Sequence, residues 1–361
     1  MQFMADENTI KEALKSVKYP GFSRDIVSFG LVQEVAVDGG TARVNLSLTT
    51  GNAKIPTEIK QAVEETLSKV QGIEAVECNI AVQAPKGATT AASGQQSAVK
   101  LPGIRRIIAV ASGKGGVGKS TVATNLACAI SQELAENGSG GSVGLLDCDI
   151  YGPSIPQMMG LHVRPEIENE KIVPPENFGI KVMSMALLVD ADAPVVWRGP
   201  MINNAISQFA QHVNWGEIDT LVVDLPPGTG DAQLSLVQTF PVDAALIVTT
   251  PQKVAVDVTR RGARMFEKVS VPIIGICENM SYLEAPDGTR QHIFGEGGGL
   301  ITSKDLDAPL LAQIPLDSDV REGGDRGLPI TISYPDSTAA KAFREMARSV
   351  LVRLESNNPM G

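Results

Sequence analysis

The stretch AVASGKGGVGKSTVATNLA, residues 109–127, contains a phosphate-binding loop of the form G-x-x-x-x-G-K-S/T, from Gly113 to Ser120. An apolar run precedes the loop and a helical pattern follows it, which is the strand–loop–helix setting that the motif requires. Glycines let backbone amides approach phosphates, and the helix adds its positive amino end. We therefore expect nucleotide contacts from Gly113, Lys114, Gly115, Gly116, Val117, Gly118, Lys119, Ser120 and Thr121.

The side chains of this loop and of two later strand ends suit ATP and Mg²⁺. Lys119 is expected to reach the β- and γ-phosphates, and the Ser120 hydroxyl to bind Mg²⁺. The apolar run TLVVD ends in Asp224, which is expected to hold a Mg²⁺-bound water. A second apolar run, LLDCD, ends in acids: Asp149 is the candidate for orienting or activating the attacking water, and Asp147 for supporting the metal shell.

The composition is that of an ordinary globular protein, with 361 residues, 43% of them hydrophobic and 20% charged. A net charge of −10 argues against general attraction to nucleic acid or to an anionic membrane. The first residues do not resemble a secretory signal, and no apolar run is long enough to span a bilayer, so a cytoplasmic location is expected. The four cysteines form no C-x-x-C pair and are interpreted as reduced cytosolic thiols: Cys78, Cys128, Cys148 and Cys277.

The chain is expected to contain two α/β domains. Residues 1–83 combine helical patterns with strand patterns and predict a small domain, and residues 84–103, rich in Ala, Ser, Gly and Thr, predict a flexible linker. Residues 104–361 alternate apolar runs with helical patterns. Because these runs are apolar throughout, they indicate strands buried on both faces, in a doubly wound, mostly parallel sheet. The predicted strands cover residues 106–112, 142–150, 180–188, 220–226, 244–251, 272–280 and 310–316.

The pattern K-G-G-x-G-K-S resembles the deviant phosphate loop of the MinD/ParA/nitrogenase-iron-protein superfamily. Longer phrases, among them DCDIYGPSIPQMMG, VVWRGPM, DTLVVDLPPGTGDAQLSL, ENMSYL and IFGEGGG, resemble the Mrp/ApbC family of iron–sulfur cluster carrier ATPases. The region before the linker is similar to the MIP18-type domain that precedes the ATPase domain in many members. The resemblance implies slow, dimer-dependent ATP hydrolysis and a homodimer that passes a 4Fe–4S cluster to apo-proteins.

The same resemblance implies roles for two further residues. The earlier lysine of the loop, Lys114, would reach across a two-fold interface and neutralise charge between the β- and γ-phosphates bound to the partner subunit. Asn279, at a strand end, matches the asparagine that contacts the base in nucleotide-binding relatives. The segment QIPLDSDVREG is expected to lie against the base as well.

One departure from the family leaves the function open. Cluster carriers usually place a C-P-x-C pair shortly after the ENMS phrase, but this chain has no cysteine between Asn279 and Gly299. Ala285 and Pro286 occupy the position of the first Cys-Pro pair, so the cluster ligands are unknown. Ligation by Glu284, Asp287 or His292 is chemically possible, and the four cysteines are expected to be buried and inert.

Three functions remain open from the sequence. The first is an iron–sulfur cluster carrier ATPase. The second is an ATP-driven dimerisation switch that regulates a protein partner without a cluster. The third, a small-molecule kinase on the same fold, ranks last because the sequence shows no acceptor pocket.

Overall fold

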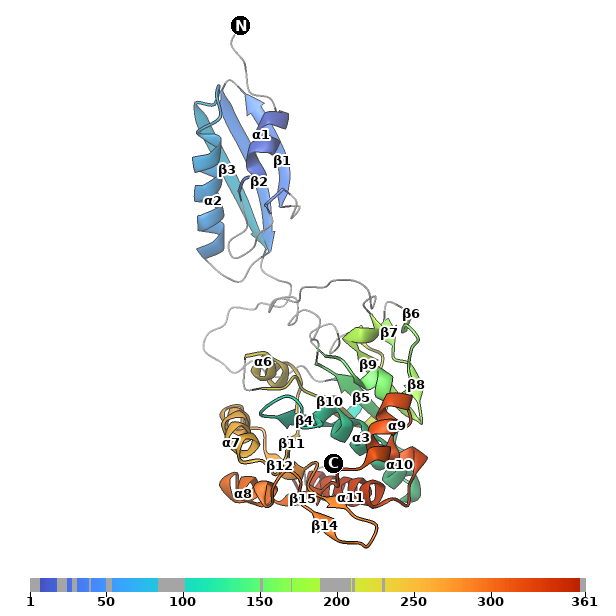
Figure 1. Cartoon of the computed structure of the whole chain (residues 1–361). Helices are drawn as coiled ribbons and strands as arrows, with labels where there is room; N and C mark the ends of the chain where they lie inside the picture. The colour runs from blue at the N-terminus through green and yellow to red at the C-terminus, as the bar shows by residue number, and fades with distance from the viewer. Residues whose placement is uncertain are drawn as a thin grey trace. The chain divides into compact units, whose positions relative to one another are not determined.

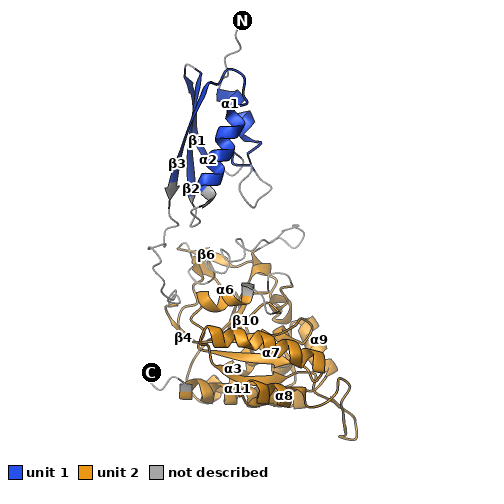
Figure 2. Ribbon diagram, turned by 90° about the vertical axis from the view of Figure 1, so that its left-hand side faces the viewer, with its two compact units in different colours: residues 1–95 blue, residues 96–361 orange. Residues whose placement is uncertain are grey.

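The computed structural model describes residues 7–17, 25–27, 31–38, 40–49, 54–83, 101–149, 152–169, 171–188, 209, 212–228 and 231–357. The chain divides into two compact units, residues 1–95 and 96–361, which are coloured separately in Figure 2. Most of the expected linker lies outside the described residues, so its flexibility stays a prediction. The phrase VVWRGPM lies outside them too.

The first unit places two helices on a three-stranded sheet in the order β1-β2-β3. Strand β2 pairs antiparallel with β1 and parallel with β3. Alternate residues of β2, among them Val44, Leu46 and Leu48, are buried in a core with Ile59 and Val63 of the second helix. The elements are α1 (Glu7–Leu14), β1 (Val32–Asp38), β2 (Thr41–Thr49), α2 (Lys54–Leu67) and β3 (Ala75–Gln83).

The second unit is built on an eight-stranded sheet in the order β15-β12-β11-β4-β10-β5-β9-β8 (Figure 1). Its first seven strands are parallel, and only β8 is antiparallel to its neighbour. The predicted doubly wound α/β fold is therefore confirmed, and each predicted run contains one strand. The strands are β4 (Ile104–Ser112), β5 (Val143–Asp147), β8 (Glu176–Asn177), β9 (Ile180–Ser184), β10 (Ile218–Asp224), β11 (Ala244–Thr249), β12 (Ile273–Glu278) and β15 (Leu310–Gln313).

Helices cover both faces of this sheet. On one face, Ile108 and Val110 of β4 pack with side chains of α3 (Lys119–Glu136) and α11 (Thr338–Asn357). On the other face, Ile107 and Ala109 pack with side chains of α6 (Asp231–Thr239) and α7 (Lys253–Lys268). Burial on both faces explains why the strands are apolar throughout instead of alternating.

Shorter elements lie around the sheet. None of the helices that the structure describes is both long and apolar enough to cross a bilayer. The remaining elements are α4 (Ile155–Met158), β6 (Glu166–Glu168), β7 (Lys171–Val173), η1 (Met185–Leu187), β13 (Leu283–Glu284), β14 (Arg290–Gln291), α8 (Gly298–Asp305), α9 (Ser318–Arg326) and α10 (Ile330–Ser333).

A buried ion pair joins β4 to β10 near the amino ends of both strands. The Arg106 guanidinium donates to both carboxylate oxygens of Asp219 at 2.7 and 2.9 Å, and both side chains are less than 10% exposed. We expect Asp219→Asn to lower the free energy of unfolding by about 3 kcal/mol, because a buried guanidinium loses its carboxylate.

Urea unfolding followed by tryptophan fluorescence measures this effect, since both tryptophans lie in the second unit. The control is Asp305→Asn, which removes a more exposed pair with Arg260 at 3.4 Å and is expected to cost less than about 1 kcal/mol. An equal decrease in the free energy of unfolding of the two variants would contradict the larger contribution that we assign to the buried Asp219 pair.

Candidate functional site

The phosphate-binding loop connects the carboxyl end of β4 to the amino end of α3. Gly116 and Gly118 have φ values of +79° and +77°, a region that side chains with a Cβ rarely adopt. At Gly113, an added Cβ would lie 2.5 Å from the backbone nitrogen of Thr259 in α7. The loop thus depends on glycine for its backbone angles and for the close approach of a helix.

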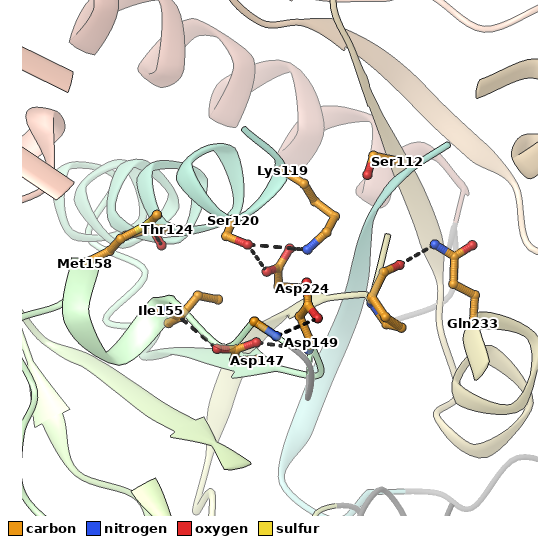
Figure 3. Close-up of polar contacts among 12 residues, drawn as sticks. Ser112, Lys119, Ser120, Thr124, Asp147, Asp149, Ile155, Met158, Asp224 and Gln233 are labelled. Carbon is orange, nitrogen blue, oxygen red and sulfur yellow. Dashed lines mark hydrogen bonds and ion pairs between the residues drawn. The ribbon is translucent and has the colours of Figure 1, made fainter. Parts of the chain in front are cut away.

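Lys119, Ser120 and Asp224 meet directly beneath the loop (Figure 3). The Lys119 Nζ lies 2.6 Å from Asp224 Oδ1, and the Ser120 hydroxyl donates to Asp224 Oδ2 at 2.6 Å. The Asp224 side chain is fully buried, and burial raises its pKa while the Lys119 ammonium opposes that rise. Hydroxyl and carboxylate oxygens are ligands that Mg²⁺ prefers, so Ser120 and Asp224 fit the metal role expected of them.

Asp147 is the last residue of the neighbouring strand β5 and Asp149 lies two residues beyond it, but the two carboxylates have different surroundings. The Asp147 carboxylate accepts hydrogen bonds from the backbone N–H groups of Asp149 and Ile155, at 3.0 and 3.3 Å, and from the Ser184 hydroxyl at 3.1 Å. Burial, with the nearby charge of Asp224, raises the pKa of Asp147 to about 7. Because its oxygens already hold the backbone after β5, Asp147 positions Asp149, a role that the sequence did not indicate.

A cavity of about 200 Å³ lies at the mouth of the loop. Asp149 also lines this cavity, as does Pro227 of the loop after β10. The nucleotide-contact residues that line it are Lys114, Gly115, Gly116, Gly118, Lys119, Ser120 and Thr121. The structure therefore brings seven of the nine predicted loop residues together around a space next to Asp149.

A second cavity, of about 340 Å³, adjoins the first and shares Thr121, Ser154 and Met158 with it. Asn279 lines this cavity together with Pro315 and Arg321, which belong to the QIPLDSDVREG segment. These are the parts of the chain expected to face a base. The contact of Asn279 with a base stays a prediction.

Asn279 also makes a contact that the sequence did not predict. Its side-chain amide donates to the backbone carbonyl of Val117 at 2.9 Å, and an added Cβ at Gly118 would lie 2.2 Å from the same amide nitrogen. Val117, 1% exposed, does not line the phosphate cavity. Asn279 therefore braces the loop from β12.

Three other polar contacts at this site were missed from the sequence. Gln233 of α6 is buried and donates its side-chain amide to the Pro226 carbonyl, in the loop that follows Asp224. The Lys114 Nζ donates to the Gln252 side-chain oxygen at 3.5 Å, and the Ser112 hydroxyl to the Lys114 carbonyl at 3.0 Å. Only tertiary structure could reveal the contact between Lys114 and Gln252, because 138 residues separate them.

The segment after Asn279, where the resemblance implied a cysteine pair, forms a hairpin of β13 and β14. Asp287 accepts hydrogen bonds from the backbone N–H and hydroxyl of Thr289 at 2.9 and 2.6 Å, and the Arg290 guanidinium lies 4.1 Å from the centre of the Tyr282 ring. The described part of the chain contains no group of three or more His, Cys, Asp or Glu side chains placed to hold a metal ion. Glu284, Asp287 and His292 thus form no such group.

The four cysteines are all free and buried. Burial raises the pKa of the Cys78 thiol to about 11 and that of Cys128 to about 12, and it also raises the pKa values of Cys148 and Cys277. Protonated, enclosed thiols are weak ligands and weak nucleophiles. Their expected burial is confirmed.

The comparisons with known proteins agree with this geometry. Residues 103–351 match the family model described as NUBPL iron-transfer P-loop NTPase, and residues 7–80 match the model described as iron-sulfur cluster assembly protein. An iron-sulfur cluster carrier protein of Synechocystis is 43% identical over 96% of this chain and 97% of its own length. The mouse iron-sulfur cluster transfer protein NUBPL is 48% identical over 71% of this chain and 80% of its own.

Solved structures are similar to the second unit. A nucleotide-binding protein of Archaeoglobus fulgidus in complex with ADP has a TM-score of 0.57 at 36% identity, covering 67% of this chain and 93% of its own. The cell division ATPase MinD of Pyrococcus furiosus, at 22% identity, has a TM-score of 0.51 over 68% of this chain and 98% of its own. The second likeness confirms the fold expected from the phosphate loop.

The contact between Gly118 and Asn279 generates a prediction about nucleotide binding. In Gly118→Ala, the new methyl group would displace the Asn279 amide from Val117. We expect the affinity for Mg²⁺-ATP to fall by about tenfold or more, because a buried hydrogen bond is lost and a left-handed backbone is strained. Isothermal titration calorimetry measures the affinity.

Gly138→Ala is the matched control, because Gly138 has φ +67° with open space around its Cβ position. It is expected to lower stability through the same backbone strain and to leave nucleotide affinity unchanged. If both variants bind Mg²⁺-ATP with wild-type affinity, the hydrogen bond between Asn279 and Val117 does not contribute to nucleotide binding.

Proposed function

The chain belongs to the NUBPL iron-transfer P-loop NTPase family, and from this premise we propose that it is an ATP-hydrolysing carrier of iron–sulfur clusters that works as a nucleotide-dependent homodimer. The observation that carries this proposal is the contact of Lys119 and Ser120 with the buried Asp224. This cluster of charge lies beneath a glycine loop whose shape suits phosphate groups. The A. fulgidus relative, solved with ADP, supports the choice of an adenine nucleotide.

In the proposed reaction, each residue acts on a separate part of Mg²⁺-ATP. Loop amides and the Lys119 ammonium hold the β- and γ-phosphates, while Ser120 and Asp224 hold the Mg²⁺, whose charge would stabilise the phosphates. Asp149, which lines the phosphate cavity, orients the attacking water. Its carboxylate accepts the Gly152 N–H at 3.3 Å, and its backbone is held by Asp147, which together limit where it points.

Lys114 is proposed to complete the site of a second subunit. It is half-buried, and among the described residues its ammonium donates only to the neutral Gln252 side chain, at 3.5 Å, a long contact. An ammonium without a close carboxylate is free to move toward phosphate charge on a partner. Because each active site would then need two chains, hydrolysis is proposed to be slow and dimer-dependent.

The cargo is proposed from the relatives whose names describe cluster carriage and transfer. Apo forms of iron–sulfur proteins would be the clients, and the first unit, which matches the cluster-assembly model, is a proposed docking module. A cluster is a substrate in this scheme. Its ligands in this chain are unassigned. The reduced, buried cysteines suit a cytoplasmic location.

A dimerisation switch without cargo remains the second candidate. The observation that favours it is the hairpin after Asn279, which contains no cysteine and whose turn is closed by the Asp287–Thr289 hydrogen bonds. ATP binding and hydrolysis would be the same in both candidates. They differ only in whether the dimer holds a cluster.

Anaerobic reconstitution with iron and sulfide separates these two candidates. A carrier is expected to develop broad visible absorbance from sulfur-to-iron charge transfer and to activate an apo-acceptor protein. A colourless product that still dimerises with ATP would contradict carriage and leave the switch. Nucleotide-free and ATP-loaded protein are compared, so that a cluster that needs the closed dimer is detected.

Replacement of the two lysines of the loop is expected to affect different steps, nucleotide binding for Lys119 and hydrolysis for Lys114. Lys119→Ala should abolish nucleotide binding, because the phosphates lose their cation. Lys114→Ala should leave the affinity within about threefold and lower kcat by about a hundredfold or more, as expected of a cation supplied in trans. Calorimetry gives the affinity and phosphate release gives kcat. Hydrolysis by Lys114→Ala at the wild-type rate would disprove its proposed role.

A further inference from the structure

An open edge of the large sheet lies beside the last helix of the chain. β15 stands at one end of the strand order and, among the described strands, pairs only with β12. Residues 310–313 make no backbone hydrogen bond with any described residue outside β12. An edge strand has a row of N–H and C=O groups that point away from its neighbour, so β15 offers unpaired donors and acceptors to another extended segment.

A groove follows this edge. A cavity of about 440 Å³ is lined by residues 310–313 and by α11, and a second cavity, of about 700 Å³, is lined by Asp307, Pro309 and a later part of α11. Because successive side chains of a strand point to opposite faces, a cavity that four consecutive residues line must lie along the edge of the strand and not on one face. We call the two cavities together the β15–α11 groove.

The helix α11 forms the other wall of the groove, and Figure 1 shows it beside β15. The first cavity meets residues 338–345 and the second meets residues 348–356, so the cavities follow one another along about 27 Å of helix. An extended segment of about eight residues has this length. One lining residue from each turn shows that the wall is a single stripe of the helix: Thr338, Lys341, Glu345, Ser349, Val352 and Ser356.

The groove is lined by more cations than anions, although the whole chain carries a net charge of −10. The charged residues that line it are the cations Arg290, Lys341, Arg348 and Arg353 and the anions Asp307 and Glu345. Arg348 is paired with Glu133 at 2.7 Å, but the other three cations form no ion pair with a described residue. The groove therefore attracts carboxylates.

We propose that the β15–α11 groove binds an extended acidic segment of a partner protein, which pairs with β15 as an added strand and places carboxylates beside Lys341 and Arg353. In strand addition, backbone hydrogen bonds supply affinity and alternate side chains supply specificity. The occupant is a peptide because the edge offers backbone groups at strand spacing, and it is acidic because three lining cations lack a carboxylate among the described residues. The residues that line the groove do not line the phosphate cavity, so this inference does not rest on the proposed function.

Fluorescence anisotropy of a labelled peptide tests the groove in the full chain. The probe has about eight residues of alternating Thr and Glu, because β-branched residues favour an extended chain and every second side chain lies on one face. Wild type is expected to bind it saturably. Lys341→Glu and Arg353→Glu are each expected to weaken binding by about tenfold or more, and Glu345→Gln to strengthen it by about threefold, because charge at close range is reversed or removed. All three side chains are exposed, so the unfolding midpoint should not change.

Two controls separate strand addition from general attraction between charges. Lys171→Glu changes an exposed lysine of β7 that lines neither cavity, and it should bind the probe as wild type does. Two further peptides are N-methylated, one at its Thr residues and the other at its Glu residues, which removes N–H donors without changing the charge. Because only one of these two sets of N–H groups faces β15 in an added strand, one peptide should bind about tenfold or more weakly and the other within about threefold of the probe.

Several outcomes would overturn the proposal. The first is no saturable binding of the probe by wild type, and the second is an equal loss of affinity in Lys341→Glu and Lys171→Glu. Equal affinity for the two N-methylated peptides would exclude an added strand and leave only attraction between charges. A short oligothymidylate that binds more tightly than the probe, and that the same variants weaken, would identify a groove for nucleic acid instead.

Discussion

A buried carboxylate facing one ammonium is the interaction on which the second unit depends. Asp224 ends β10 with no exposed surface, and an isolated charge there would be costly. The Lys119 ammonium lies 2.6 Å away, and the Ser120 hydroxyl satisfies the other oxygen. Since β10 lies between β4 and β5, this carboxylate reaches both the phosphate loop and the acids that follow β5. The strand order therefore assembles the site.

The loop itself is held from two sides by elements that carry no phosphate ligand. From β12, Asn279 donates to the Val117 carbonyl, and from α7 the backbone of Thr259 approaches Gly113 within the space that a side chain would need. Because of these contacts, the loop is already ordered before nucleotide binds, so less conformational entropy is lost on binding. The contact of Thr259 with Gly113 also links the phosphate loop to α7.

The hairpin after Asn279 departs from what the resemblance implied for this segment, because it contains no cysteine. Its turn is closed by the Asp287 carboxylate, and its base is covered by the Arg290 guanidinium stacked on Tyr282. Neither arrangement presents a soft sulfur ligand. The hairpin therefore supplies no thiolate that could hold a cluster at this position.

The sequence alone determined the parallel sheet, the phosphate loop and the acidic strand ends, because each of these depends on local spacing. A strand buried on both faces must be apolar along its length, and a phosphate loop requires glycines and a lysine at set positions. The roles of Asp147, Gln233 and Gln252 and the contact of Asn279 with Val117 were decided only by tertiary structure. Asn279 and Val117 are 162 residues apart, and nothing in either local pattern specifies that they meet. Such contacts form because the sheet brings distant strand ends to one edge, where each buried polar group must find a hydrogen-bond partner.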